Sequence, residues 1–196
     1  MNKRQAQVER CTKETGIKLT LDLDGSGQAN LNTGVPFLEH MLNLWSRHGL
    51  FDLTIEAQGD LEIDDHHLVE DVGIALGEAF RLAVGKKEGI KRYGFFLLPM
   101  DESLVMVSLD ISDRPLLVFE VEIPSERVGE FDTELLEEFM RAFTHEARIT
   151  LHLKLIHGRN SHHIIEALFK GLGKSLDQAL EIDSRVKGVP STKGKL

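Results

Sequence analysis

The chain has 196 residues, 41% of them hydrophobic and 28% charged, a composition ordinary for one or two soluble globular domains. Its net charge of −9 disfavours a nucleic-acid backbone as a partner, and the single cysteine, Cys11, excludes an internal disulfide framework and favours a reducing, cytoplasmic compartment. The polar N-terminal stretch predicts no signal peptide, and no apolar run is long enough to span a bilayer.

In the first half of the chain, hydrophobic periodicity predicts both strands and helices. Residues 17–22 alternate apolar and polar side chains, as a half-buried strand does, and the glycine-rich stretch 24–27 is typical of a hairpin turn. Pro36 favours a helix start and Gly49 a helix end. We therefore expect a helix over 37–48, a strand over 51–56 and a second helix over 66–84.

The second half of the chain follows a similar order. Its apolar runs predict strands over 94–99, 103–110, 116–123 and 149–155. Asp132 is expected to cap a helix that runs to residue 147, and another helix is expected over 162–180. Residues 186–196 are rich in Gly, Pro, Ser and Lys, which predicts a flexible tail.

The two halves match in register, although few residues are identical. Phe37-Leu38-Glu39-His40 corresponds to Leu135-Leu136-Glu137-Glu138, 98 positions later. This match predicts an internal duplication within a single domain, with halves over residues 5–88 and 89–182. Each half has an apolar sheet face and two helices to cover it, so we expect an α+β fold with helices packed between or against two four-stranded sheets.

One motif occurs twice, over residues 64–71 and 160–167. Each copy has two adjacent histidines with a glutamate three and four positions later, and Gly77 and Gly173 follow at the same spacing. The motif residues are His66, His67 and Glu70 in the first copy and His162, His163 and Glu166 in the second. A single copy is compatible with an exposed helix start and a capping glutamate, but the repetition favours metal binding.

Helix geometry separates the two histidines of each pair. Residues four apart lie on one face of a helix, so the first histidine and the glutamate can bind one ion. The second histidine points about 100° away and is better placed to reach another ion. We therefore predict crossed ligand sets, one of His66, Glu70 and His163 and the other of His162, Glu166 and His67.

Two further histidines are candidates to complete these sets. His40 lies in the first predicted helix, and His152 in the strand before the second motif. Either histidine can be a hydrogen-bonded core residue. If each of the two ions needs a further ligand, however, His40 and His152 can supply one to each ion. Mixed imidazole and carboxylate ligands favour Mn²⁺, Fe²⁺, Co²⁺ or Zn²⁺ over Ca²⁺ and Mg²⁺, and open coordination positions favour a catalytic site.

Basic side chains near these motifs are candidates for binding an anion. They are Lys91, Arg92, Arg114, Arg159, Lys170 and Lys193. Each alone is more commonly a solvated charge, but a subset gathered at one mouth of an acidic protein would bind a phosphate or carboxylate.

Nine segments together resemble the imidazoleglycerol-phosphate dehydratase family of histidine biosynthesis. They span the chain from Arg10 to Gly194, so the similarity is global. The segments are 10–15, 34–41, 47–49, 59–67, 69–71, 99–102, 150–152, 162–170 and 190–194. Glu62 departs from the histidine that many members carry, at a position that we take as peripheral to the metals.

The resemblance implies a duplicated fold of the ribosomal protein S5 domain 2-like type and an assembly of 24 identical subunits with active sites built between them. It also implies two Mn²⁺ per site, held by His40, His66, His67, Glu70, His152, His162, His163 and Glu166. The implied substrate is D-erythro-imidazole glycerol phosphate, which loses water to become imidazole acetol phosphate.

In the chemistry that the resemblance implies, a metal-stabilised imidazolate expels the hydroxyl to give a diazafulvene, and a base then removes the neighbouring proton. Glu14 is the candidate proton-transferring carboxylate, with substrate positioning as its alternative role. The other implied substrate-binding residues are His40, His48, Arg92, Arg114, Lys170, Ser191, Thr192 and Lys193.

Two other functions are compatible with the histidines alone. A dinuclear metallohydrolase would need a bridging carboxylate and metals about 3.5–4 Å apart. The histidines outnumber the carboxylates among the predicted ligands, which argues against that function. A non-catalytic protein that assembles its subunits through histidines is the other alternative, and an assay for ketone formation separates all three.

Overall fold

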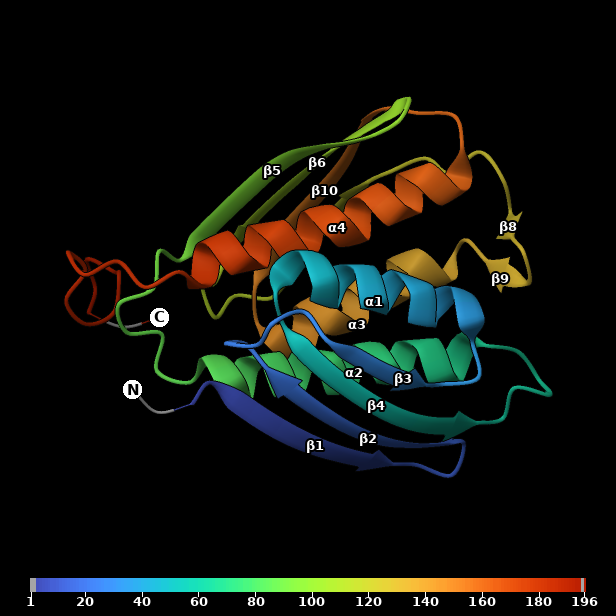
Figure 1. Cartoon of the computed structure of the whole chain (residues 1–196), viewed down its shortest axis with the longest axis horizontal. Helices are drawn as coiled ribbons and strands as arrows, with labels where there is room; N and C mark the ends of the chain where they lie inside the picture. Colours follow the sequence, from blue (N-terminus) through green and yellow to red (C-terminus); the bar gives the residue numbers. More distant parts are fainter. Residues whose placement is uncertain (1–2, 195) are drawn as a thin grey trace.

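The structure is a computed structural model that describes residues 3–194 and 196, and within them four helices lie between two sheets (Figure 1). The first sheet contains β1 (Gln5–Cys11), β2 (Thr15–Asp22), β3 (Ala29–Asn32) and β4 (Asp52–Gly59). The second contains β5 (Tyr93–Met100), β6 (Ser103–Asp110), β7 (Leu116–Glu120) and β10 (Thr150–His157). The helices are α1 (Pro36–Gly49), α2 (His66–Val84), α3 (Leu135–Ala147) and α4 (Ser161–Leu180), and a short ladder pairs β8 (Arg127–Val128) with β9 (Phe131–Asp132).

Strand order shows the duplication directly. The two sheets run β1-β2-β4-β3 and β5-β6-β10-β7. In each sheet the last strand in sequence pairs antiparallel with the second strand and parallel with the third. The predicted α+β fold with two four-stranded sheets is therefore confirmed.

Amphipathic periodicity explains the layers. In α1, Leu38, Met41, Leu42 and Trp45 are buried at helical spacing. In β6, every second residue from Ser103 to Leu109 is buried under the helices. Helix α2 packs on the first sheet and α4 on the second, while α1 packs against α4 and α3 against α2.

Glycines allow the helix pairs to approach closely at equivalent places in the two halves. A Cβ on Gly77 of α2 would lie 2.6 Å from the Phe143 carbonyl oxygen of α3. A Cβ on Gly173 of α4 would lie 2.6 Å from the Trp45 carbonyl oxygen of α1. The matched glycines of the two sequence motifs are therefore the contact points of two equivalent helix crossings.

The hairpin predicted at residues 24–27 is wrong. Strand β2 pairs with β1 and β4, and β3 pairs in parallel with β4. The Asp52 carboxylate accepts hydrogen bonds from the backbone N–H groups of Ser26 (2.8 Å) and Gln28 (2.9 Å). This contact folds the turn onto the start of β4, so the chain does not return along β2.

The predicted cap of α3 is also wrong. Asp132 lies in β9, where its carboxylate pairs with Arg127, and the helix begins later at Leu135. Strand β7 ends at Glu120, three residues before the predicted end. Helix α1 ends at Gly49, as predicted, and Leu50 takes the left-handed conformation that follows it, with φ 59°.

Helix α2 (His66–Val84) has the predicted bounds, and α4 starts one residue earlier than predicted. In the part of the chain that the structure describes, no helix combines the length and apolar character needed to cross a membrane.

Candidate metal-binding site

Both histidine motifs open a helix, and the two helix starts lie at the same end of the molecule (Figure 1). The Asp64 carboxylate accepts a hydrogen bond from the His66 backbone N–H (2.8 Å), and the Asn160 side chain accepts one from the His163 N–H (3.3 Å). Asp64 and Asn160 therefore satisfy these helix starts, and the motif glutamates lie one turn further along with their carboxylates available. This arrangement argues against the interpretation of the glutamates as caps.

The second motif gathers a three-ligand cluster. Ligand atoms of His40, His162 and Glu166 lie within 4.8 Å of one another. Glu166 Oε2 is 3.1 Å from His162 Nε2 and 3.5 Å from His40 Nε2. His40 comes from α1 and the other two from α4, so the α1–α4 packing described above creates the cluster.

The spacing within the cluster fits a divalent metal. Two ligand atoms at about 2.1 Å from an ion lie about 3.0 Å apart at a right angle and about 3.4 Å apart in a tetrahedron. Burial alone would raise the pKa of Glu166, but Lys170 and His162 outweigh it and hold the pKa below its usual value. The carboxylate therefore stays ionised, and with two imidazoles it forms a ligand set suited to Mn²⁺, Fe²⁺ or Zn²⁺.

The first motif is less complete within one chain. His66 Nε2 lies 3.9 Å from Glu70 Oε2. Across residues 3–194 and 196, the cluster around Glu166 is the only one that brings three candidate ligands together. The crossed ligand sets stay a prediction, because the chain alone does not bring His163 to Glu70.

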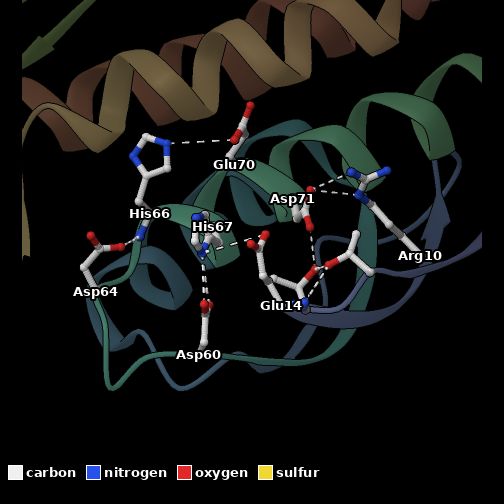
Figure 2. Close-up of polar contacts among 10 residues, drawn as sticks. Arg10, Glu14, Asp60, Asp64, His66, His67, Glu70 and Asp71 are labelled. Atoms are coloured by element: carbon white, nitrogen blue, oxygen red, sulfur yellow. Dashed lines mark hydrogen bonds and ion pairs between the residues drawn. The ribbon is translucent and has the colours of Figure 1, made fainter.

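Adjacent histidines point in different directions, as helix geometry requires. The His66 and His67 ring planes are inclined at 86° with their centroids 6.1 Å apart, and those of His162 and His163 at 87° and 6.4 Å. Figure 2 shows His66 directed toward Glu70 and His67 directed toward Asp60. Each motif thus presents its two imidazoles on different sides.

The second histidine of each motif lies within hydrogen-bond distance of a carboxylate. His67 Nδ1 lies 3.0 Å from Asp60 Oδ2, and His163 Nδ1 lies 2.7 Å from Glu102 Oε2. The hydrogen bond that His67 donates to Asp60 raises the pKa of His67, and the one that His163 donates to Glu102 raises the pKa of His163. The same His163 contact holds the pKa of Glu102 well below its usual range. Sequence reasoning missed both carboxylates.

Glu14 lies beside the first motif, as Figure 2 shows. Its Oε2 is 4.0 Å from His67 Nδ1, and its side chain is 57% exposed. Asp71 of α2 ties this turn to the helix, because its carboxylate accepts hydrogen bonds from Arg10 (2.8 Å) and from the Thr15 hydroxyl. Glu14 therefore has both the accessibility and the anchoring that a group acting on a substrate needs.

A pocket of about 840 Å³, lined by basic side chains, lies at the C-terminal end of the chain. Five of the predicted substrate-binding residues line it: Arg92, Arg114, Ser191, Thr192 and Lys193. The Arg92 guanidinium donates to the Pro190 carbonyl (2.9 Å), which draws the tail toward β5. Arg92 and Arg114 also share Asp110, which raises the pKa of Arg92 through a hydrogen bond of 2.6 Å.

Two other predicted substrate-binding residues lie elsewhere. Lys170 pairs with Glu166 of the metal-competent cluster. Burial lowers the pKa of His48, and the nearby Lys170 and Lys174 lower it further. The structure therefore places Lys170 and His48 along the α1–α4 contact, apart from the arginine-lined pocket.

His152 lies on the outer face of the second sheet, between Ser108 and Val118 on the neighbouring strands. Helix α4 covers the inner face of that sheet, so His152 is remote from His162 within one chain. The residue that corresponds to His40 by the 98-residue offset is instead Glu138 of α3.

Figure 1 shows the start of α4, which carries the cluster, and the C-terminal segment, whose residues line the pocket, at opposite ends of the molecule. Helix α4 starts beside the cluster and runs the length of the molecule before the tail enters the pocket. The class that these observations define is a duplicated α+β fold with a histidine–carboxylate cluster that could hold a divalent metal at one end and a separate basic pocket at the other.

Comparison with known proteins identifies the family within this class. The imidazoleglycerol-phosphate dehydratase family model matches residues 33–176. Imidazoleglycerol-phosphate dehydratase of Thermoanaerobacter pseudethanolicus is 58% identical over 193 residues, covering 98% of this chain and 100% of the relative. That of Trichlorobacter lovleyi is 58% identical over 194 residues, covering 99% of this chain and 100% of the relative.

Solved structures agree. The crystal structure of the dehydratase from Staphylococcus aureus has a TM-score of 0.84 and 43% identity, covering 91% of this chain and 99% of that chain. The structure from Pyrococcus furiosus, in complex with (S)-C348, has a TM-score of 0.82 and 40% identity, covering 96% of this chain and 100% of that chain. The chain belongs to the imidazoleglycerol-phosphate dehydratase family and is a hydro-lyase.

Proposed function

We propose that this chain dehydrates D-erythro-imidazole glycerol phosphate to imidazole acetol phosphate in L-histidine biosynthesis, with two Mn²⁺ per active site. The observation that carries the proposal is the cluster of His40, His162 and Glu166 in a chain of this family. Mn²⁺ bound there would supply a Lewis acid for the substrate imidazole.

The chain's own side chains divide the remaining work. The imidazole gives up its N–H proton and its electrons expel the hydroxyl from the adjacent carbon as water, which leaves a diazafulvene. Glu14, exposed beside His67, takes the proton from the next carbon; the electrons of that bond return to the ring, whose nitrogen regains a proton, and the resulting enol becomes the ketone by moving its hydroxyl proton to carbon. The alternative role of Glu14 is to position the substrate, since its carboxylate can accept a hydrogen bond from a substrate hydroxyl.

The arginine-lined pocket binds the phosphate in this proposal. Arg92 and Arg114 offer guanidinium donors, and Lys193 and the Ser191 and Thr192 hydroxyls add donors from the tail. Asp110 orients both arginines through its carboxylate. The phosphate would therefore enter a site whose donors are already positioned.

A direct assay of ketone formation from the imidazole substrate tests the reaction. Glu166→Gln removes one charge and one metal-binding oxygen, and we expect it to lower kcat/KM by about two orders of magnitude or more and to reduce bound Mn²⁺. Glu62→Gln removes the same charge from an exposed position and serves as the matched control. Wild-type protein that holds Mn²⁺ and forms no ketone would refute the reaction.

We also propose that each active site combines residues from different copies of the chain in a homo-oligomer of 24 subunits. The separation of the cluster from the arginine-lined pocket supports this, because one small substrate cannot reach both within one chain. The second sheet supports it too, because large apolar side chains are exposed on its strands. These are Tyr93, Phe95, Leu97, Leu116 and Ile156.

Mixing two inactive variants tests the shared site. Glu166→Gln damages the cluster and Arg92→Ala damages the pocket. If each site takes its pocket from one subunit and its cluster from another, equal mixing after disassembly should restore about a quarter of the wild-type activity. Activity that stays at the level of the separate variants, with mixed oligomers confirmed by mass spectrometry, would show that one chain supplies the whole site.

A further inference from the structure

The second histidine of each motif meets a carboxylate in the same way, although the two carboxylates come from different parts of the fold. Asp60 directly follows β4, and Glu102 lies in the turn between β5 and β6. The residue 98 positions after Asp60, the offset of the strand before it, is Gly158, and the residue 96 positions after it, the offset of the histidine motifs, is Ile156, so the duplication does not supply an acid at the equivalent place. The chain therefore reaches one local arrangement by two unrelated routes.

This arrangement decides which ring nitrogen is free. An ionised carboxylate only accepts hydrogen bonds, so the Nδ1 atom beside it must carry the proton. A neutral imidazole protonated at Nδ1 has its lone pair on Nε2. His67 and His163 then offer Nε2 to a metal, the same nitrogen that His66 and His162 direct toward their glutamates.

We propose that Asp60 and Glu102 are positioning residues for Mn²⁺: each holds the Nδ1 proton of its histidine, so that Nε2 of His67 and of His163 is aimed and available as a metal ligand. The inference rests on the proposed function, since it assigns these two histidines to the metal site. Carboxylates that hold the outer nitrogen of a metal-binding histidine fix both its tautomer and its ring orientation.

The two carboxylates differ in what else they do. The Glu102 carboxylate also accepts hydrogen bonds from the backbone N–H groups of Asn160 (2.8 Å) and Arg159 (3.2 Å) and from the Ser103 hydroxyl (3.1 Å). It therefore clamps the loop before α4 as well as His163. The Asp60 side chain, 17% exposed, has His67 as its described polar partner. Asp60 is thus the cleaner test of positioning.

Three variants of one loop separate positioning from general charge. Asp60→Ala removes the hydrogen-bond acceptor, Asp60→Asn keeps a carbonyl oxygen that can accept from His67 Nδ1, and Glu62→Ala removes an equal charge from an exposed side chain. Glu102→Gln is the companion variant, because its amide oxygen can still accept from the loop backbone. Full-length protein is stripped of metal, titrated with Mn²⁺ and followed by the EPR signal of free Mn²⁺.

We expect Asp60→Ala to weaken Mn²⁺ binding by about 10–100-fold, with the melting temperature of the metal-free protein unchanged. Asp60→Asn should recover part of this loss, and Glu62→Ala should bind as the wild type does. The inference would be overturned if Asp60→Ala bound Mn²⁺ as tightly as the wild type. It would also be overturned if Glu62→Ala weakened Mn²⁺ binding as much as Asp60→Ala does. Ketone formation by the wild type is measured alongside, so the reaction can stand while the positioning role fails.

Discussion

Replacing Gly173 by alanine should destabilise the protein through the α1–α4 crossing. The added Cβ would lie 2.6 Å from the Trp45 carbonyl oxygen, whereas ordinary contact begins at 3.4 Å, so the helices must separate by about 0.8 Å. Overpacking of this kind costs about 1–3 kcal/mol, and the better helix propensity of alanine returns about 1 kcal/mol. The net loss is therefore at most about 2 kcal/mol, which corresponds to at most about 8 °C in melting temperature for a chain of this length.

Two further variants make this prediction specific. A Cβ in Gly77→Ala would lie at the same 2.6 Å from the Phe143 carbonyl oxygen at the α2–α3 crossing, so its loss of stability should match that of Gly173→Ala. Gly16→Ala is the control, because a Cβ there meets nothing within 4 Å. Calorimetry at fixed protein and Mn²⁺ concentrations measures all three. If Gly173→Ala has the same melting temperature as Gly16→Ala, the crossing is not tightly packed and the steric argument is refuted.

Three other predictions concern the metals, the tail and pH. His66→Ala and His163→Ala should lose the same Mn²⁺ in titrations; loss of one shared ion in His66→Ala and His67→Ala, with His163→Ala intact, would contradict the crossed sets. Deleting residues 190–196 should lower kcat/KM by about 10–100-fold in steady-state assays without loss of Mn²⁺, because it removes the charged hydrogen bond of the tail lysine; full activity would contradict it. Hydrogen bonds from the backbone N–H groups of Gln28 and Ser26 lower the pKa of Asp52. The difference in unfolding free energy between the wild type and Asp52→Asn should therefore be largest at neutral pH and should vanish as the pH falls through the folded-state pKa of Asp52. A pH-independent difference in denaturant unfolding would contradict this prediction.

Local periodicity predicted most of the fold. The helices carry their apolar residues at helical spacing over three turns or more, which makes their existence and approximate bounds readable from sequence. Strand β3 was not predicted, because four residues, Ala29–Asn32, are too few to show a pattern. The hairpin prediction failed because the turn at 24–27 is held by Asp52, a contact between residues more than twenty positions apart.

The same division applies to the site. The His162–Glu166 pair was predictable because both residues lie on one face of one helix. The contact between His163 and Glu102 joins residues 61 positions apart, and no local pattern indicates it. His152 stays a predicted ligand: strand alternation turns it to the outer face of the sheet, so only another copy of the chain could bring it to a metal site.

The duplication repeats the scaffold but not its chemistry. His40 of α1, in the first half, completes a three-ligand cluster with α4 of the second half, whereas the residue of α3 that corresponds to His40 is Glu138. The more open first motif, with His66 and Glu70 3.9 Å apart, is then the one with most need of ligands from elsewhere. A second copy of the chain can supply them with the same helix start that carries His163. The proposed assembly would then supply the missing ligands, because His66 and Glu70 have no third candidate ligand beside them in the part of the chain that the structure describes.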